Sequence, residues 1–408
     1  MNTNCELISS FDTFTKVKNM DRAWAEIDLE NLKHNVEEIK KYLHPKCEFM
    51  AVVKANGYGH GSVEISRYLN KINVYNFAVA TIDEAIELRG GKVKGDILIL
   101  GYTHPSRLND LIKYDLIQTV VDYTYAEELN TFEKDIRVHL KIDTGMHRLG
   151  EDYHNEDIIN KIFSFNNLKI EGVFSHLYVA DSKEREDIIC TEEQIENFFK
   201  IAKSIKDKFN SNIKIHLQSS YGVLNYPNLP CDYARLGIVM YGVKSSMQDN
   251  IRININLKPV LSLKARIAIV KNIKAGDAVS YGRQYIADKD MKVATVTIGY
   301  ADGIPRNISK GDAFVLVKGM KARIIGRVCM DQLMIDVTNI NNVEEGNVVT
   351  LIGKDNKEYV SAEELCEVAE TITNEFLTRL SKRLQYYYKE NIMNFKEYGF
   401  EDTSCTRT

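Results

Sequence analysis

Lys54 lies in the stretch with the clearest chemical character, AVVKANGYGHG (51–61). The apolar residues Ala51–Val53 predict the end of a buried strand, and a Gly- and Asn-rich turn follows the lysine. A lysine at the lip of a buried strand is partly desolvated, which lowers the pKa of its ammonium group and leaves a nucleophilic amine. Such an amine could form a Schiff base with a carbonyl cofactor. The glycines would let backbone N–H groups approach an anion such as phosphate.

Further polar residues follow other predicted strands. They are Arg148 in HLKIDTGMHRLG (139–150), His176 in EGVFSHLYVAD (171–181), Ser219 and Ser220 in KIHLQSSYG (214–222), and Arg235 in DYARLGIVMYG (232–242). Each has an ordinary explanation when taken alone: a core histidine, helix-capping serines, arginines in surface ion pairs. Together they offer a lysine, a histidine, serines and arginines at strand ends, which is where the active sites of parallel barrels lie.

Eight short apolar runs precede or contain these residues. They are Phe49–Val53, Phe77–Ala80, Ile97–Leu100, Ile117–Val121, Val138–Ile142, Ile170–Phe174, Ile213–Leu217 and Leu236–Met240. Helical stretches separate several of them, such as 82–89, where Thr81 and Glu84 could form a capping box, and Glu192–Lys208. Apolar strands alternating with helices predict a parallel sheet covered on both faces. We therefore expect an α/β protein whose residues 22–255 form a (β/α)8 TIM-type barrel.

The pattern changes after residue 255. Apolar and polar residues alternate from Leu261 to Ile269, which is typical of a strand with one solvated face, and further strand-like runs follow. We expect a mainly antiparallel β domain over 256–393, with a helical tail at about 362–388. The flanking segments 1–21 and 394–408 should be weakly ordered.

Three strings in this second region carry polar and aromatic residues. VSYGRQY (279–285) holds Tyr281, IGYADGIPR (298–306) holds Tyr300 and Arg306, and GRVCMDQLMIDVT (326–338) holds Met330 and Asp331. Tyrosine is common in strands and turns, and methionine is common in cores, so none of these strings indicates a function alone.

Bulk properties narrow the class of protein. The 408 residues carry a formal charge of −4, so no excess of positive charge indicates binding to nucleic acid. The seven cysteines are scattered without a CxxC pair, so they indicate neither a zinc site nor a disulfide framework and fit a reducing cytoplasm. No signal-peptide pattern and no apolar run of membrane-spanning length is visible. We expect a cytoplasmic protein without metal, nucleic-acid or membrane partners.

Taken together, the strings resemble those of alanine racemases, fold-type III enzymes that use pyridoxal 5'-phosphate (PLP), from about Arg22 to Arg383. The resemblance implies a homodimer. It implies that Lys54 is the Schiff-base lysine and one catalytic base, and that Tyr281 is the opposing base, contributed by the partner subunit. It further implies that His176 supports this tyrosine and that Arg148 lies near the cofactor phenolate and the substrate carboxylate.

The resemblance assigns the remaining residues as well. Arg235 would face the pyridine nitrogen, and Lys141 matches a lysine that is often carbamylated and orients Arg148. The cofactor-binding set is Lys54, Tyr58, His176, Ser219, Ser220, Arg235, Gly237 and Ile238. The substrate-binding set is Arg148, Tyr300, Met330, Asp331 and Asn374, with Asp181, Arg306 and Arg327 in the substrate corridor.

Arg235 bears most directly on the type of reaction. An arginine stays protonated, so it would leave the pyridine nitrogen unprotonated and make the cofactor a weaker electron sink. A short-lived carbanion favours return of the proton over side reactions. Decarboxylases of the same fold type usually have a carboxylate there, which disfavours a decarboxylase. A non-catalytic PLP-binding regulator, the other alternative, would resemble the barrel alone and would lack the β domain.

Asn374, in TITNE (371–375), departs from the family pattern, which has a tyrosine there. Asparagine is smaller and offers a donor and an acceptor, so it makes room for a hydroxymethyl group that it could also bind. The same change occurs in the membrane serine racemases of vancomycin resistance. We therefore expect racemisation of both serine and alanine, which would supply D-amino acids for cell-wall precursors. The alternative is a strict alanine racemase in which Asn374 is neutral.

Overall fold

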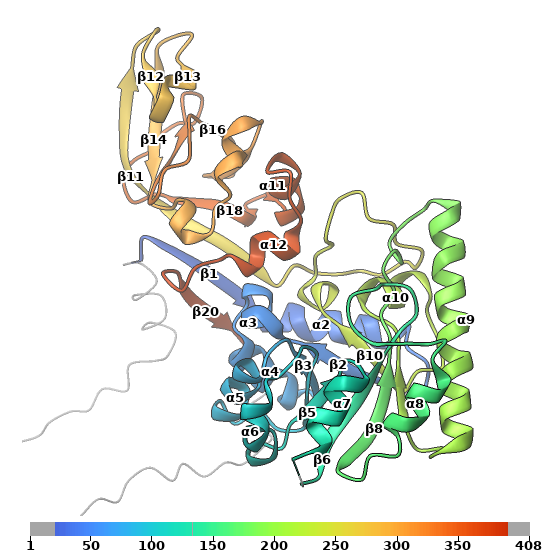
Figure 1. The fold of residues 1–408 in the computed structure, drawn as a ribbon. Coiled ribbons are helices and arrows are strands. Elements are labelled where there is room, and N and C mark those ends of the chain that lie inside the picture. The colour runs from blue at the N-terminus through green and yellow to red at the C-terminus, as the bar shows by residue number, and fades with distance from the viewer. Residues whose placement is uncertain (1–20, 133, 391–408) are drawn as a thin grey trace, which may run out of the picture.

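An eight-stranded parallel sheet forms the N-terminal part of the computed structural model, which describes residues 21–132 and 134–390 (Figure 1). Its strands run in the order β10-β2-β3-β4-β5-β6-β8-β9. The Asp232 amide donates to the Ile215 carbonyl at 2.7 Å and the Arg235 amide to the Gln218 carbonyl at 2.9 Å, which joins the two ends of this order. The expected (β/α)8 barrel is therefore confirmed. Its strands are β2 (Glu48–Val52), β3 (Asn76–Val79), β4 (Asp96–Ile99), β5 (Ile117–Val120), β6 (Ile136–Asp143), β8 (Leu168–Phe174), β9 (Lys214–His216) and β10 (Tyr233–Leu236), with the short β7 (Glu151–Asp152) beside β6.

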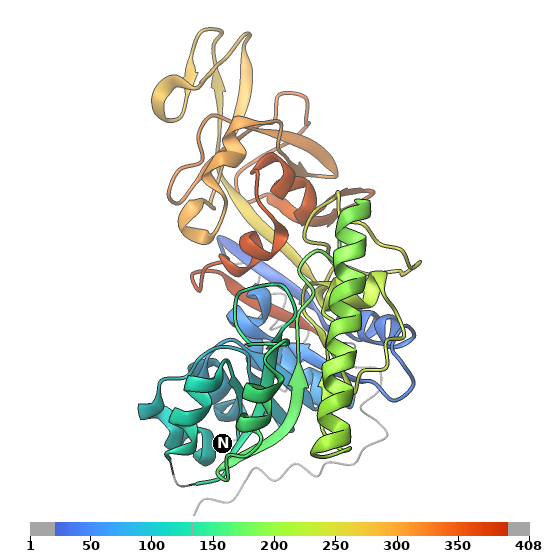
Figure 2. The ribbon, with the colours of Figure 1, turned by 45° about the vertical axis from the view of Figure 1, so that its right-hand side comes forward.

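Helices cover the outside of the barrel, and local sequence explains where several begin. Asp28 caps the first, accepting from the Asn31 amide at 2.9 Å. Thr81 and Glu84 form the expected capping box. The helices are α2 (Leu29–Lys40), α4 (Ser62–Lys71), α5 (Ile82–Gly90), α6 (Leu108–Lys113), α7 (Tyr123–Asn130), α8 (Glu156–Ile162), α9 (Arg185–Lys208) and α10 (Ser220–Asn225). The longest of these, α9, stands along one side of the barrel (Figure 2).

The last barrel strand differs from the prediction. The apolar run Leu236–Met240 is not a strand, because β10 ends at Leu236 and residues Ile238–Tyr241 form a 3-10 turn. Gly237, with φ −110° and ψ −106°, turns the chain between the two. All four residues of the turn are buried. The apolar run therefore predicted correctly that these residues are buried, but burial alone does not distinguish a strand from a turn.

A nine-stranded sheet forms the second part, in the order β19-β18-β15-β16-β17-β14-β11-β1-β20. Its pairs are antiparallel except β1 with β20, so the expected antiparallel β domain is present. The bounds are β1 (Ala23–Asp28), β11 (Leu261–Ile273), β14 (Met291–Val296), β15 (Phe314–Val317), β16 (Met320–Ile325), β17 (Leu333–Asp336), β18 (Val348–Asp355), β19 (Glu358–Val360) and β20 (Gln385–Lys389). A small hairpin of β12 (Ala278–Val279) and β13 (Tyr285–Ile286) lies at the end of this domain away from the barrel (Figure 1).

Two expectations about the ends of the chain need correction. Strand β1 lies in the second sheet although we expected the barrel to begin at residue 22. The predicted helical tail consists of α11 (Ala362–Val368), α12 (Thr373–Thr378) and then strand β20. Tyr386–Tyr388 belong to β20, which pairs with β1 in parallel. Local sequence could not reveal this pairing, because the two strands are far apart in the chain. The segments 1–20 and 394–408, expected to be weakly ordered, lie outside the described residues. Within 21–132 and 134–390 no helix is long and apolar enough to cross a membrane.

Asp302 connects the start and the end of the chain to the β domain. Its fully buried carboxylate accepts two hydrogen bonds from Arg22, at 2.6 and 3.1 Å, and one from the Gly299 amide at 3.0 Å. Arg383 Nε lies 3.6 Å from the same carboxylate. A buried carboxylate is tolerated because these donors satisfy it.

We expect Asp302→Asn to lower the free energy of unfolding by about 2–3 kcal/mol. The neutral amide loses the ion pair with Arg22, and its NH2 group replaces one acceptor oxygen and faces a donor. Urea unfolding followed by fluorescence of Trp24, the single tryptophan, which is buried in β1, measures this loss. Asp312→Asn is the matched control, because Asp312 pairs with Arg323 on the surface and its side chain is 72% exposed. Equal midpoints for the two variants would contradict the role given to Asp302.

Candidate active site

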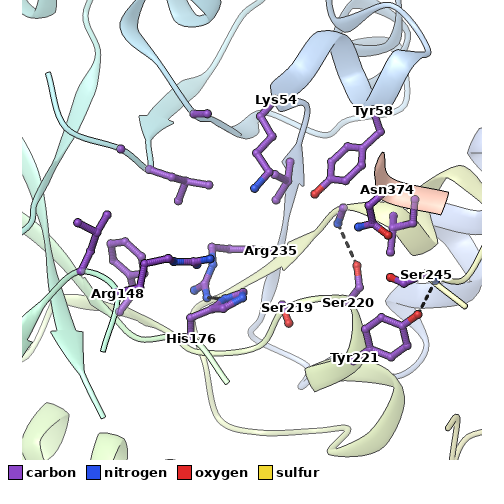
Figure 3. Close-up of a pocket in the computed structure, with 18 of the residues that line it drawn as sticks. Lys54, Tyr58, Arg148, His176, Ser219, Ser220, Tyr221, Arg235, Ser245 and Asn374 are labelled. Atoms are coloured by element: carbon purple, nitrogen blue, oxygen red, sulfur yellow. Dashed lines mark hydrogen bonds between the residues drawn. The ribbon is translucent and has the colours of Figure 1, made fainter. Parts of the chain in front are cut away.

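A cavity of about 420 Å³ opens at the carboxyl ends of the barrel strands. Eleven of the predicted site residues line it: Lys54, Tyr58, Lys141, Arg148, His176, Ser219, Ser220, Arg235, Gly237, Ile238 and Asn374. Asn374 comes from α12, so the region after the barrel supplies one wall. Arg148, His176 and Arg235 gather at one side of the cavity, and Tyr58, Ser220 and Asn374 gather at the other (Figure 3). The Lys54 side chain points between the two groups (Figure 3).

The segment that carries Lys54 has an unusual backbone. Ala55, Asn56, Gly57 and Tyr58 all have φ between 51° and 61°, so α3 (Lys54–Gly59) is a left-handed turn. Such a conformation costs about 1–2 kcal/mol for each residue with a side chain. Hydrogen bonds hold it in place: the Gly57 amide donates to the Val53 carbonyl at 2.9 Å, and the Asn56 side chain accepts from the amide of Ser62 at 3.1 Å. The turn brings Lys54 and Tyr58 to the same cavity.

The environment of Lys54 favours a neutral amine. Burial is the main cause that lowers the pKa of Lys54, and the positive charge of Arg148 lowers it further. The charge of Glu84 raises this pKa, and the charge of Arg235 lowers it. A lowered pKa raises the fraction of unprotonated amine near neutral pH, which is the form that attacks a carbonyl carbon.

Arg235 is buried in the barrel, and several acceptors hold its two terminal nitrogens. Its guanidinium donates to the Ser175 carbonyl at 2.6 Å, to Nδ1 of His216 at 2.9 Å and to Nδ1 of His176 at 3.3 Å. Because arginine only donates, both Nδ1 atoms act as acceptors and carry no proton. Burial, followed by the charge of Arg235, keeps the pKa of both histidines well below its usual range. Burial lowers the pKa of Arg235 itself to about 10, so it stays charged at neutral pH.

Lys141 lies buried beside these arginines, with Nζ 5.1 Å from the centre of the Phe174 ring. Burial is the main cause that lowers its pKa to about 7, and the charges of Arg235 and Arg148 add to it. A substantial fraction of this amine is therefore unprotonated near neutral pH. An unprotonated amine is the form that carbamylation requires, which is compatible with the role that the resemblance implies for Lys141.

The opposite end of the cavity is lined by hydroxyl groups. Tyr58 and Ser220 lie there, with Ser219 between them and His176 (Figure 3), and Ser220 Oγ accepts from the Gly237 amide at 3.1 Å. A Cβ at Gly237 would meet the Tyr58 hydroxyl at 2.6 Å, so a larger residue there would displace the Tyr58 ring. Among the described residues, the cavity lining contains two lysines and two arginines but no carboxylate. This composition suits a ligand that carries negative charge.

Four predicted site residues do not line the cavity of the same chain: Tyr281, Tyr300, Met330 and Asp331. They lie together on the β domain, where the Tyr300 amide donates to the Cys329 carbonyl at 3.0 Å and Ser280 Oγ donates to the Arg327 carbonyl at 2.7 Å. The predicted corridor residues Arg306 and Arg327 belong to the same loops, and Asp181 follows β8; none of these three lines the cavity. Tyr281 is 67% exposed and Met330 is 53% exposed.

The comparisons with known proteins agree with this geometry. The family model for the N-terminal domain of alanine racemase matches residues 27–245, and the model for the C-terminal domain matches residues 260–388. The chain belongs to the alanine racemase family. The structure of an alanine racemase from Clostridium difficile 630 is 33% identical, has a TM-score of 0.83, and is matched over 91% of this chain and 97% of that one.

Two relatives of the chain have names other than alanine racemase. An amino-acid racemase of Enterococcus faecalis is 45% identical over 89% of this chain and 51% of the relative. A serine/alanine racemase of Enterococcus gallinarum is 38% identical over 89% of this chain and 51% of the relative. The chain thus spans about half the length of these curated relatives.

Several cavity residues were not found from the sequence. Phe174, whose ring lies 5.1 Å from the Arg235 guanidinium carbon, was treated only as part of an apolar strand. Tyr221 directly follows the serine pair, a position that could have drawn attention to it. Ser245 lies in a loop with no recognisable signal.

The lowered pKa of Lys141 predicts a dependence of stability on pH. Between about pH 7 and pH 10.4 the unfolded chain holds a proton on this amine that the folded chain has lost, so stability rises with pH over that window, by up to about 1.4 kcal/mol per unit. Lys141→Met lacks this contribution. Urea unfolding of both proteins at several pH values in carbonate-free buffer measures the difference. The free energy of unfolding of the wild type should rise relative to that of the variant as the pH increases. Parallel curves would contradict the lowered pKa.

Proposed function

We propose that the chain is a PLP-dependent amino-acid racemase that interconverts L- and D-serine and L- and D-alanine. The observation that carries this proposal is the convergence, in one cavity, of a desolvated lysine, two arginines and a hydroxyl-lined end. Membership of the alanine racemase family supports it.

The cavity fits PLP by its donor set. The hydroxyls of Tyr58, Ser219 and Ser220 would hold the phosphate, and Arg235 would donate to the pyridine nitrogen. The bound cofactor supplies a carbonyl that joins the amino group and an electron sink for the negative charge at Cα. Since Arg235 remains protonated and is held by several acceptors, it would keep that sink weak. This favours proton return and argues against the decarboxylase alternative.

Racemisation needs two bases on opposite faces of Cα, one to remove the proton and one to return it. Lys54 is the base within the cavity. We propose that Tyr281 of the partner subunit is the other, because the Tyr281 side chain of the same chain is exposed and lies outside the cavity. Arg148 would bind the substrate carboxylate. The β domain that carries Tyr281 would be superfluous in a non-catalytic PLP-binding regulator, which makes that alternative weaker.

Complementation of two inactive variants tests the shared site. Lys54→Ala and Tyr281→Phe should each lose nearly all racemisation. In randomly mixed head-to-tail dimers, half are heterodimers with one intact site, so about a quarter of the wild-type activity should return. D-Serine and D-alanine formation, measured by chiral chromatography, gives the activity.

The control for this experiment mixes Lys54→Ala with the double variant Lys54→Ala/Tyr281→Phe, which contains no intact combination and should stay inactive. Failure of the first mixture to exceed its separate components, although heterodimers are present, would contradict a base supplied in trans.

Asn374 is the reason to include serine as a substrate. Its Oδ1 is buried and has no hydrogen-bond partner among the described residues. A buried acceptor without a partner costs free energy, and a hydroxyl donor in the cavity would remove that cost. The hydroxymethyl group of serine offers such a donor, whereas the methyl group of alanine does not. The serine/alanine racemase among the relatives supports this substrate range.

We expect Asn374→Tyr to lower the ratio of kcat/KM for L-serine to that for L-alanine by about 10- to 100-fold, because a phenol ring fills the space and removes the acceptor. Asn374→Leu is the matched control, since it keeps the volume but has no acceptor. If the hydrogen bond decides the preference, both variants lose it; if space alone decides, only the tyrosine variant does. An unchanged ratio in Asn374→Tyr would contradict the role of this residue.

We further propose that the enzyme acts as a homodimer in the cytoplasm and supplies D-amino acids for cell-wall precursors. The family resemblance and the scattered, unpatterned cysteines support this setting.

A further inference from the structure

His139 lies buried inside the barrel, and the function proposed above gives it no role. It belongs to β6 and is the register partner of Gly172 in β8. A Cβ at Gly172 would lie 2.7 to 2.8 Å from three atoms of the His139 ring, so a larger residue there would displace this ring. His139 also lines a second cavity, of about 290 Å³, together with residues at the amino ends of the barrel strands such as Asp96 and Ile117.

His139 ends a chain of hydrogen bonds that begins at Arg235. Its Nδ1 atom lies 2.9 Å from Nε2 of His216, and Nδ1 of His216 accepts from Arg235 at 2.9 Å. Burial lowers the pKa of His139 to about 3 and keeps the pKa of His216 well below its usual range, so both rings are neutral near pH 7. A neutral imidazole carries one proton. Because Nδ1 of His216 is an acceptor, this proton is on Nε2, and His216 donates to Nδ1 of His139.

The chain bears on the direction in which Arg235 points. Its two terminal nitrogens donate to Nδ1 of His216 and His176 and to the carbonyls of Ser175, His216 and Leu217. Within the part of the chain that the structure describes, Nε of Arg235 makes no hydrogen bond, so its N–H is the donor left for a ligand. The acceptors around the terminal nitrogens therefore aim this donor. The carbonyls always accept, whereas Nδ1 of His216 accepts only while the proton is on Nε2.

We propose that His139 is a positioning residue for Arg235, because its Nδ1 accepts from His216, fixes the tautomer of that ring and so keeps the guanidinium directed at the pyridine nitrogen of the cofactor. The inference rests on the proposed use of PLP. Without the acceptor on His139, the Nε2 proton of His216 would be buried without a partner, which costs free energy. Moving this proton to Nδ1 removes that cost but places a second donor against Arg235. Both outcomes loosen the guanidinium.

Two variants of nearly equal shape separate the acceptor from the space that it fills. His139→Asn keeps a carbonyl oxygen close to the position of Nδ1, whereas His139→Leu has no acceptor. Nitrogen-15 NMR of the full chain, labelled in its histidine rings and stripped of cofactor, reads the tautomer. The His216 signals are identified by their loss in His216→Gln.

We expect the wild type and His139→Asn to carry the His216 proton on Nε2. In His139→Leu the ratio of the Nδ1-protonated form to the Nε2-protonated form should rise at least tenfold, the effect of one lost hydrogen bond.

The chain loaded with PLP gives a second readout, the balance between racemisation and a side reaction. With L-alanine, the side reaction transfers the amino group to the cofactor and yields pyruvate and pyridoxamine phosphate. The ratio of pyridoxamine phosphate to D-alanine should rise about tenfold in His139→Leu and stay within twofold of the wild type in His139→Asn. A merely structural role of His139 would affect both variants alike.

A His216 proton on Nδ1 in the wild type would overturn the inference, and this measurement does not depend on the folding of either His139 variant. Equal changes in the two His139 variants would also overturn it, as would an unchanged tautomer or an unchanged product ratio in His139→Leu. Failure of the wild type to bind PLP would refute the proposed function. It is distinguished from failure of the His139 inference, because the NMR comparison is made without cofactor.

Discussion

The left-handed turn after Lys54 is the constraint on which the rest of the site depends. Four consecutive residues, Ala55–Tyr58, have left-handed backbone angles, and the turn they form brings Lys54 and Tyr58 to one cavity. The unfavourable backbone must be offset by its surroundings. The Ala55 amide donates to Glu84 at 2.6 Å, and the buried ring of His60 stacks on Tyr241 with centres 4.2 Å apart.

The same turn explains why the region after the barrel is part of the site. Helix α12 packs so closely on the turn that a Cβ at Gly59 would lie 1.9 Å from the Leu377 carbonyl oxygen. Gly59, with φ +80°, therefore meets both a conformational and a steric requirement for glycine. The packing fixes α12 against the barrel and brings Asn374 over the cavity. Lys54 and Asn374 are thus both positioned by the packing of α12 on the turn.

Sequence patterns predicted much of this arrangement, and physical reasons explain the remainder. Strands of a parallel barrel are apolar on both faces, so seven of the eight runs matched strands closely. The eighth was misread because Ile238–Tyr241 are equally buried without being extended. The pairing of β1 with β20 depends on residues more than 350 positions apart, and no local pattern encodes it. Motif residues such as Lys54 and Arg235 were identifiable, whereas Ser245 was not, since only its neighbours in space bring it to the cavity.

The predicted site residues lie on two separate surfaces, the barrel cavity and the exposed loops of the β domain. The cavity itself contains the lysine, the arginines and Asn374, all from one chain, so binding and side-chain selection would be settled within a protomer. The loops around Tyr281, Tyr300 and Met330 are held together on the β domain by backbone hydrogen bonds and present exposed, largely apolar side chains. Exposed apolar side chains gathered on one set of loops suit a contact with a second copy of the chain. If the base on the second face of Cα arrives by this route, a lone protomer would bind an amino acid without racemising it, and assembly of the dimer would complete the catalytic apparatus.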